Sequence, residues 1–214
     1  MQPDWLEWHR QYVGSHTALS ERLHLVQRFI RAVLEGTGKP RIQVVSICSG
    51  QAHDLIGALI DHPRREEVRG RLIEIDERSV RIARRAARRC GLSRLEFVCG
   101  DASVTDAYAG AVPADLVLCC GVFGNLLLND VERTIVHLPQ LCAENAFVIW
   151  TRHTRAPDVI PDIRRLFAAH GFAEAAFEST DRFGVGVVRM IARPQPLQLG
   201  CRIFHFGKGL WDTV

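Results

Sequence analysis

The sequence IQVVSICSGQAHD, residues 42–54, decides the fold class of this chain. Its first half is a run of apolar, mostly β-branched side chains, which predicts a buried strand at residues 42–47. The turn that follows is built from small residues, namely Cys48, Ser49, Gly50 and Ala52. An apolar helical pattern then runs over residues 54–60, so that a ligand could reach backbone N–H groups in the turn. The stretch therefore predicts a nucleotide-like cofactor site at the carboxyl end of a parallel strand.

Three more strands are predicted downstream, and each ends in a turn that carries a polar residue or a glycine. The strands are residues 71–75, 95–99 and 115–120, which lead into Asp76, Asp101 and Gly121. A long helix is predicted at residues 79–90, directly after Asp76. An acid at the end of the second strand suits a ribose, because one carboxylate can accept hydrogen bonds from both hydroxyls.

In this order, the four strand ends resemble those of the class I S-adenosylmethionine-dependent methyltransferases, over about residues 40–192. The resemblance implies that Gly50 lies at the methionine end of S-adenosylmethionine and Asp76 at the ribose. It also implies that Asp101 and the backbone of Ala102 meet the adenine. The cofactor residues expected on this basis are Ser46, Cys48, Gly50, Asp54, Asp76, Asp101, Ala102 and Gly121.

The first motif departs from the pattern of that family. The family usually has an acid at the position of Ser46 and glycines at those of Cys48 and Ala52, and only Gly50 remains. A side chain makes a positive φ angle more costly than it is for glycine. This departure leaves open a non-catalytic module that still binds S-adenosylmethionine. A dehydrogenase is disfavoured, because residues 48–53 do not supply G-x-G-x-x-G.

The remaining pattern completes an α/β architecture. Helices are predicted at residues 19–34, 130–142 and 157–170, and strands at residues 146–150, 173–178 and 185–191, with a short extra strand at 202–206. We expect a Rossmann-like, seven-stranded, mostly parallel sheet with helices on both faces. The last strand should be antiparallel, between the fifth and the sixth. Residues 1–39 are expected to form an N-terminal helical cap on the α/β domain of residues 40–214, in one globular unit.

Composition favours one soluble, cytoplasmic domain. The chain has 214 residues, of which 47% are hydrophobic and 24% charged, enough for a single core. Residues 1–10 carry charges and indoles where an export signal needs an apolar segment. The longest apolar region, residues 114–128, is interrupted and too short for a membrane helix. Seven cysteines without a C-x-x-C pair indicate buried, reduced thiols, with a zinc site or a redox pair as the less favoured alternative, and no metal site is expected.

The expected reaction is methyl transfer to a small-molecule acceptor. The sulfonium of S-adenosylmethionine is already electrophilic, so alignment and exclusion of water do most of the work. A base helps where the nucleophile must lose a proton, and His153, after the fifth strand, is the candidate. Asn125 could orient the acceptor and Phe123 could pack against a ligand. The alternatives are a surface or core histidine, a turn asparagine and a core phenylalanine.

Two other segments bear on the acceptor. Trp8 and Tyr12 belong to an N-terminal aromatic cluster that could grip an aromatic acceptor, or could dock on the sheet or on a second subunit in a homodimer. Arginines repeat along the helix at residues 79–90, which permits an RNA or DNA methyltransferase. A solvated helix face is the simpler interpretation. Residues 120–125 also lack the Asn/Asp-Pro-Pro-aromatic motif of base-modifying enzymes, so nucleic acid is not the expected partner.

Overall fold

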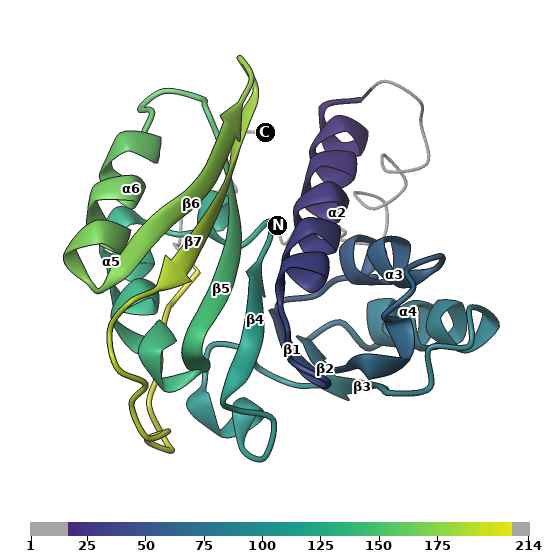
Figure 1. Cartoon of the computed structure of the whole chain (residues 1–214). Coiled ribbons are helices and arrows are strands. Elements are labelled where there is room, and N and C mark those ends of the chain that lie inside the picture. Colours follow the sequence, from purple (N-terminus) through teal and green to yellow (C-terminus); the bar gives the residue numbers. More distant parts are fainter. Residues whose placement is uncertain (1–16, 207–214) are drawn as a thin grey trace.

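A seven-stranded sheet in the order β3-β2-β1-β4-β5-β7-β6 runs through the computed structural model, which describes residues 17–206 (Figure 1). The strands are β1 (Ile42–Ile47), β2 (Val68–Glu74), β3 (Leu95–Cys99), β4 (Ala114–Cys119), β5 (Cys142–His153), β6 (Phe172–Ser179) and β7 (Phe183–Met190). Strands β1 to β5 pair in parallel, and β7 is antiparallel to both β5 and β6. The predicted fold class is confirmed, including the antiparallel last strand between the fifth and sixth.

Helices cover both faces of this sheet (Figure 1). They are α2 (Ala18–Gly36), α3 (His53–Leu59) and α4 (Glu77–Arg89) on one face, and α5 (Leu128–His137) and α6 (Ile160–Ala169) on the other. A capping box between Thr17 and Ser20 begins α2. On α4, Val80, Ala83 and Ala87 are buried, while the arginines from Arg81 onward point outward. Helix α4 therefore has the amphipathic character of an outer helix.

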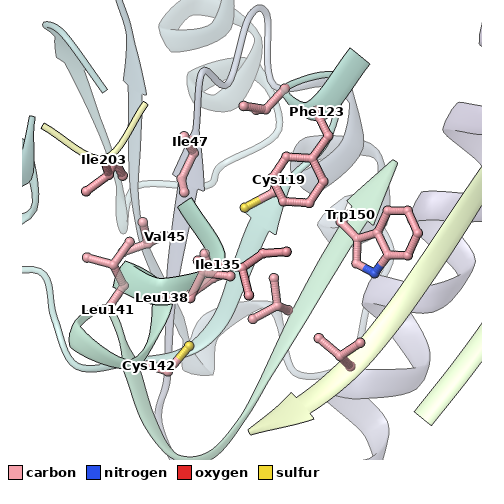
Figure 2. Packing of buried hydrophobic residues seen from close by; sticks show 14 of the residues in the cluster. Val45, Ile47, Cys119, Phe123, Ile135, Leu138, Leu141, Cys142, Trp150 and Ile203 are labelled. Carbon is pink, nitrogen blue, oxygen red and sulfur yellow. The ribbon is translucent and has the colours of Figure 1, made fainter. Parts of the chain in front are cut away.

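The core on the α5 and α6 face is built around aromatic rings (Figure 2). Trp150 on β5 lies with its ring centroid 5.8 Å from that of Phe167 and 6.2 Å from that of Phe123. Its indole packs directly over Gly186 of β7, where a Cβ atom would come within 2.4 Å of the ring. Because Gly186 has no side chain, the indole of Trp150 can occupy this space on the face of the sheet.

Several predicted boundaries are wrong. The helix expected at residues 130–142 ends at His137, because a 3-10 turn containing Pro139 follows and Cys142 already begins β5. The helix expected from residue 157 begins at Ile160, whose backbone N–H donates a hydrogen bond to Asp158 Oδ1 at 3.0 Å. The strand expected at residues 202–206 is reduced to one bridge between Val104 and Arg202.

Residues 191–206, here called the C-terminal strap, return from the end of β7 to the carboxyl ends of the parallel strands. The link from β3 to β4 contains only the 3-10 turn η2 (Thr105–Tyr108), so it leaves part of the sheet face uncovered. The strap fills that place, with Ile203 and Phe204 fully buried against the core. Within residues 17–206, no helix is long and apolar enough to cross a membrane.

Candidate cofactor site

A cavity of about 680 Å³ lies at the carboxyl ends of β1 to β4. Its wall is formed by the turn after β1, the end of β2 with the start of α4, the turns after β3 and β4, one side of α2 and the strap. This is the edge at which open parallel sheets bind their ligands. Six separate segments of the chain meet around this cavity, and its volume suits a molecule of nucleotide size.

The turn after β1 keeps a left-handed backbone at three alternate positions. The φ angle is +51° at Cys48, +54° at Gly50 and +56° at Ala52. Hydrogen bonds hold this shape, from Ser49 N–H to Ile73 O at 2.9 Å and from Ala52 N–H to Ser49 O at 2.8 Å. The turn thus has the conformation that glycines would favour, although Cys48 and Ala52 carry side chains.

Glu74, which the sequence analysis missed, links this turn to the next strand. Its Oε2 accepts from Gly50 N–H at 2.9 Å, and its Oε1 accepts from Asp76 N–H at 2.8 Å. The carboxylate lies on the cavity wall at the end of β2. Since each carboxylate oxygen can accept two hydrogen bonds, Glu74 can still receive ligand hydroxyls.

Asp76 also lines the cavity, but its carboxylate caps the start of α4. It is the N-cap residue, and Oδ1 accepts from Arg78 N–H at 2.9 Å and from Arg78 Nε at 3.2 Å. Partial burial raises the pKa of Asp76, but the hydrogen bonds from Arg78 and Ser79 outweigh it, so the pKa is lowered. Much of its hydrogen-bonding capacity is therefore used within the helix start.

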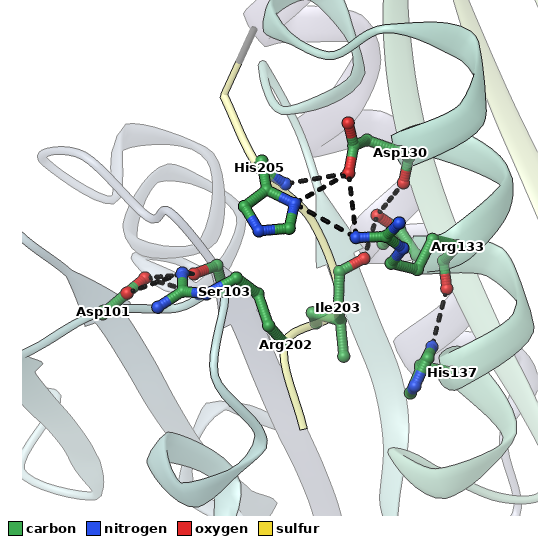
Figure 3. Close-up of polar contacts among 9 residues, drawn as sticks. Asp101, Ser103, Asp130, Arg133, His137, Arg202, Ile203 and His205 are labelled. Atoms are coloured by element: carbon green, nitrogen blue, oxygen red, sulfur yellow. Dashed lines mark hydrogen bonds and ion pairs between the residues drawn. The ribbon is translucent and has the colours of Figure 1, made fainter. Parts of the chain in front are cut away.

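Asp101 is joined to the C-terminal strap (Figure 3). Ser103 donates to Oδ1 through its N–H at 2.9 Å and its hydroxyl at 2.6 Å, and Arg202 donates to Oδ2 at 3.1 Å. Partial burial raises the pKa of Asp101, but the Ser103 and Arg202 contacts outweigh it and lower the pKa. Asp101 therefore presents a fixed, ionised acceptor to the cavity.

The end of β4 is held by two side-chain hydrogen bonds. Gly121 N–H donates to Thr151 Oγ1 and Asn125 Nδ2 donates to Gly121 O, both at 2.8 Å. Burial raises the pKa of the cavity-lining thiols Cys48 and Cys120, and nearby carboxylates raise it further, so both stay protonated at neutral pH. Asn125 lines the cavity while it shapes this turn.

Asp54 is the remaining carboxylate on the wall, at the end of the cavity near β1 and β4. Burial raises its pKa, which the Leu55 N–H and the positive charge of Arg22 oppose. The imidazole of His53 is also on the wall, with Nε2 at 3.2 Å from Gln51 Oε1.

Several expected residues do not line the cavity. Ser46, Ala102 and Phe123 are buried, at 2%, 4% and 0% exposure, since Ser46 lies inside β1 and Phe123 belongs to the aromatic core. His153 is the last residue of β5 and does not line the cavity. Its burial and the positive charges of Arg152 and Arg155 lower the pKa of its imidazole.

Trp8 and Tyr12 lie outside the described residues. A different histidine, His205 of the strap, lies on the wall, with Nδ1 at 3.4 Å from Asp130 Oδ1 and 3.1 Å from Arg133 Nη1 (Figure 3). Among residues 17–206 no group of three or more His, Cys, Asp or Glu side chains is arranged to hold a metal ion.

Comparison with solved structures identifies the fold class. Magnesium protoporphyrin IX methyltransferase from Synechocystis PCC 6803, with bound S-adenosylmethionine, superposes with a TM-score of 0.65 at 16% identity, over 86% of this chain and 89% of that one. An O-methyltransferase family protein from Burkholderia thailandensis gives 0.61 at 16% identity, over 81% of this chain and 58% of its own. The ribosomal protein L11 methylase from Lactobacillus delbrueckii subsp. bulgaricus gives 0.59 at 14% identity, over 83% and 81%.

This chain therefore has the fold of the class I S-adenosylmethionine-dependent methyltransferases, as the resemblance implied. No protein-family model matches the sequence, and no curated protein does.

Proposed function

We propose that this protein is an S-adenosylmethionine-dependent methyltransferase that acts on a small-molecule acceptor. The observation that carries the proposal is the junction of Gly50, Glu74 and Asp76 at the wall of a nucleotide-sized cavity. The presence of S-adenosylmethionine and S-adenosylhomocysteine in two structures of the Synechocystis enzyme supports the same cofactor here.

The order of groups along the wall fits the parts of this cofactor. The turn at residues 48–52 would receive the methionine end, and the adjacent end of β2 would receive the ribose. We assign the ribose hydroxyls to Glu74 first, because Asp76 is engaged with Arg78 at the start of α4. Asp101, one strand further out, offers an acceptor to the exocyclic amine of adenine.

Methyl transfer needs an acceptor placed in line with the sulfonium and shielded from water. Bound S-adenosylmethionine would supply the activated methyl group. The strap and the turn after β4 would form the acceptor side, with Gly121, Asn125 and His205 on the wall. His205 and His53 replace His153 as candidates to accept a proton from an acceptor hydroxyl or amine, because both imidazoles line the cavity.

The arginine face of α4 remains the basis of the alternative, an RNA or DNA methyltransferase. The start of α4 reaches the cavity through Asp76, Arg78 and Ser79, whereas Arg81 and Arg84 are engaged with Glu77 and with Phe97 O. A solvated helix face explains this arrangement without a polyanion.

Calorimetric titration tests the proposal. The wild-type protein should bind S-adenosylmethionine and S-adenosylhomocysteine in the micromolar range, about −8 kcal/mol. NAD⁺ should produce no binding heat, since the turn does not offer a pyrophosphate-binding G-x-G-x-x-G. Binding of NAD⁺ but of neither methionine-derived compound would refute the proposed function.

A further inference from the structure

His205 of the strap lines the cavity and contacts helix α5 (Figure 3). The two residues before it, Ile203 and Phe204, are fully buried, so the backbone that carries His205 is held in place. Thr134 Oγ1 donates to Ile203 O at 3.3 Å, and His205 N–H donates to Asp130 Oδ1 at 3.0 Å. The imidazole is therefore anchored to α5, on which both Thr134 and Asp130 lie.

Nδ1 of His205 faces two groups of opposite charge. Asp130 Oδ1 lies 3.4 Å from this nitrogen and Arg133 Nη1 lies 3.1 Å from it, while the carboxylate oxygen and the guanidinium nitrogen are 3.6 Å apart. The Asp130 side chain is only 14% exposed, so water screens its charge weakly. Within residues 17–206 the other ring nitrogen, Nε2, has no hydrogen-bond partner. Nε2 is therefore the ring nitrogen that remains for a group in the cavity.

Asp130 and Arg133 favour different tautomers of a neutral imidazole. A guanidinium can only donate, so the Arg133 contact requires a lone pair on Nδ1 and places the proton on Nε2. A carboxylate can only accept, so the Asp130 contact places the proton on Nδ1 and leaves a lone pair on Nε2. Only the second tautomer can take a proton from a group in the cavity. Once it has done so, both ring nitrogens carry protons, and Asp130 is the neighbour that can accept from Nδ1.

An apolar surface adjoins His205 on the cavity wall. Phe206 lines the cavity, and its ring packs edge-on against that of Phe204 with the centroids 5.3 Å apart. The α2 side of the cavity adds Leu23 and Val26. This part of the wall suits a molecule with an apolar body that carries one polar reacting group.

We propose that Asp130 makes His205 a general base for an acceptor hydroxyl, while Arg133 favours the tautomer that is not a base. The proposal rests on the proposed function and names the acceptor class. A hydroxyl must lose a proton to become a strong nucleophile. A carboxylate has no proton to lose, and a neutral amine attacks through its own lone pair. Asp130 is a positioning residue in this scheme, because it acts through His205.

The reaction balances with the groups in the cavity. The acceptor oxygen forms a bond to the methyl carbon while the bond between sulfur and that carbon breaks. The electron pair of the broken bond stays on sulfur, which gives S-adenosylhomocysteine. The hydroxyl proton passes to Nε2 of His205, and Nδ1–H donates to Asp130. The product is the methyl ether of a hydroxyl compound with an apolar body.

The tautomer of His205 tests the proposal without methyl transfer. In protein labelled with ¹⁵N-histidine, ring nitrogen shifts recorded at a pH where imidazole is neutral show which nitrogen carries the proton. His205→Gln assigns the signals. Asp130→Asn should move the proton toward Nε2, and Arg133→Gln should move it toward Nδ1. The same tautomer population in the wild type and both variants would overturn the role of Asp130, and the proposed function would survive.

Transfer of labelled methyl groups to the small-molecule fraction of a cell extract tests the same roles in the reaction. Asp130→Asn should lower the rate at saturating S-adenosylmethionine about tenfold or more, within the range of general-base effects, and Arg133→Gln should not lower it. Both variants should bind S-adenosylhomocysteine within about twofold of wild type, because neither residue lines the cavity. An equal loss of rate in both variants would indicate a structural contact and overturn the proposal.

Glu132→Gln is the matched control. Glu132 is a carboxylate of α5 that pairs with His170, away from the strap, with Oε1 at 3.5 Å from the imidazole Nε2. This variant should match the wild type in the His205 tautomer, in the transfer rate and in affinity for S-adenosylhomocysteine. Thermal melting of each variant confirms that the protein tested is folded.

The labelled product identifies the acceptor group. A methyl ether resists mild alkali and releases its label as methyl iodide in hydriodic acid, which is the expected result. Release of labelled methanol by mild alkali would reveal a methyl ester and overturn the hydroxyl class. Label that resists both treatments lies on nitrogen or carbon and would overturn it equally. A wild-type protein that binds S-adenosylhomocysteine but labels no small molecule would overturn the proposed function together with this proposal.

Discussion

The carboxylate of Glu74 accepts the Gly50 N–H at 2.9 Å, and this contact ties the turn after β1 to the end of β2. The second oxygen of Glu74 accepts the Asp76 N–H at 2.8 Å. One side chain thus shapes the two strand ends at which a methionine end and a ribose would meet. Asp76, the acid that the sequence favours for the ribose, is the N-cap residue of α4.

Glu74→Ala should therefore reduce affinity for S-adenosylhomocysteine more than Asp76→Ala does. We expect a loss of about 1–3 kcal/mol of binding free energy for Glu74→Ala, from hydrogen bonds to the ligand and to Gly50. Calorimetric titration of both variants measures the difference. A larger loss for Asp76→Ala would return the ribose to Asp76.

Asp76→Ala should instead lower the free energy of unfolding. Removal of an N-cap costs about 0.5–2 kcal/mol, because a backbone N–H at the helix start loses its partner. Urea denaturation of the unliganded protein measures this. Glu77→Ala is the matched control, since its exposed side chain contacts Arg81 on the helix surface and should change stability little. An Asp76 variant as stable as the wild type would contradict the capping role.

Ala52→Gly should stabilise the protein. Ala52 has φ of +56°, a conformation that costs a side chain about 1–2 kcal/mol and costs glycine little. Glycine also makes the unfolded chain more flexible, so we expect a net gain of about 0.5–1 kcal/mol in the free energy of unfolding. Cys48→Gly, at φ of +51°, should behave in the same way.

Ala58→Gly supplies the contrast, because Ala58 lies within α3, where glycine should destabilise by about 1 kcal/mol and leave a small gap in the core. Chemical denaturation of the three variants shows which sign each change has. Destabilisation by Ala52→Gly would mean that the left-handed turn is not a source of strain.

Asp54 should make stability depend on pH in the opposite sense to a salt-bridged acid. Burial raises its folded-state pKa above the unfolded value, so its contribution to stability is complete below about pH 3.9 and declines as the pH rises through the folded-state pKa. Asp54→Asn removes this titration. The melting temperature of the variant, relative to wild type, should therefore be higher at about pH 7 than at about pH 4.

Asp101→Asn should show the reverse trend. Its folded-state pKa is lowered, so its contribution to stability is present above the unfolded pKa and declines as the pH falls through the folded value.

A constant difference in melting temperature between Asp54→Asn and wild type across this pH range would show that the folded and unfolded pKa values of Asp54 coincide.

Gly186→Ala should destabilise the core. A Cβ atom at this position would lie 2.4 Å from the Trp150 ring, which is fully buried between β7 and α6. We expect a loss of about 1–3 kcal/mol, since a packed core cannot move the indole without strain. Gly38→Ala, where nothing lies within 4 Å, should leave the denaturation midpoint nearly unchanged. Equal midpoints for the two variants would contradict the packing described for Trp150.

The sequence predicts the parallel part of the sheet well. Strands β1 and β3 have the predicted bounds, because each is a short apolar run that stops at small or polar turn residues. The predicted end of α5 is wrong, since the mostly apolar residues 138–142 fit the pattern of a helix as well as that of a strand. Only the position of these residues beside β4 in the folded protein decides between a helix and a strand.

The site is predicted less completely than the fold. Glu74 and Asp76 are two positions apart at one strand end, and their roles differ through the hydrogen bonds that each makes in the fold. Arg22, Arg202 and His205 reach the cavity from segments far from the strand ends, by the packing of α2 and of the strap. No local pattern in their own segments indicates such contacts.

The transfer of labelled methyl groups would show directly whether this protein methylates a small molecule. The protein would be incubated with S-[methyl-¹⁴C]adenosylmethionine and, separately, with the small-molecule, RNA and protein fractions of a cell extract. We expect label in the small-molecule fraction, formation of S-adenosylhomocysteine in equal amount, and less of both with Glu74→Ala at a concentration of the cofactor below saturation. Label in the RNA or protein fraction alone, or no transfer to any fraction by a protein that binds the cofactor, would contradict it.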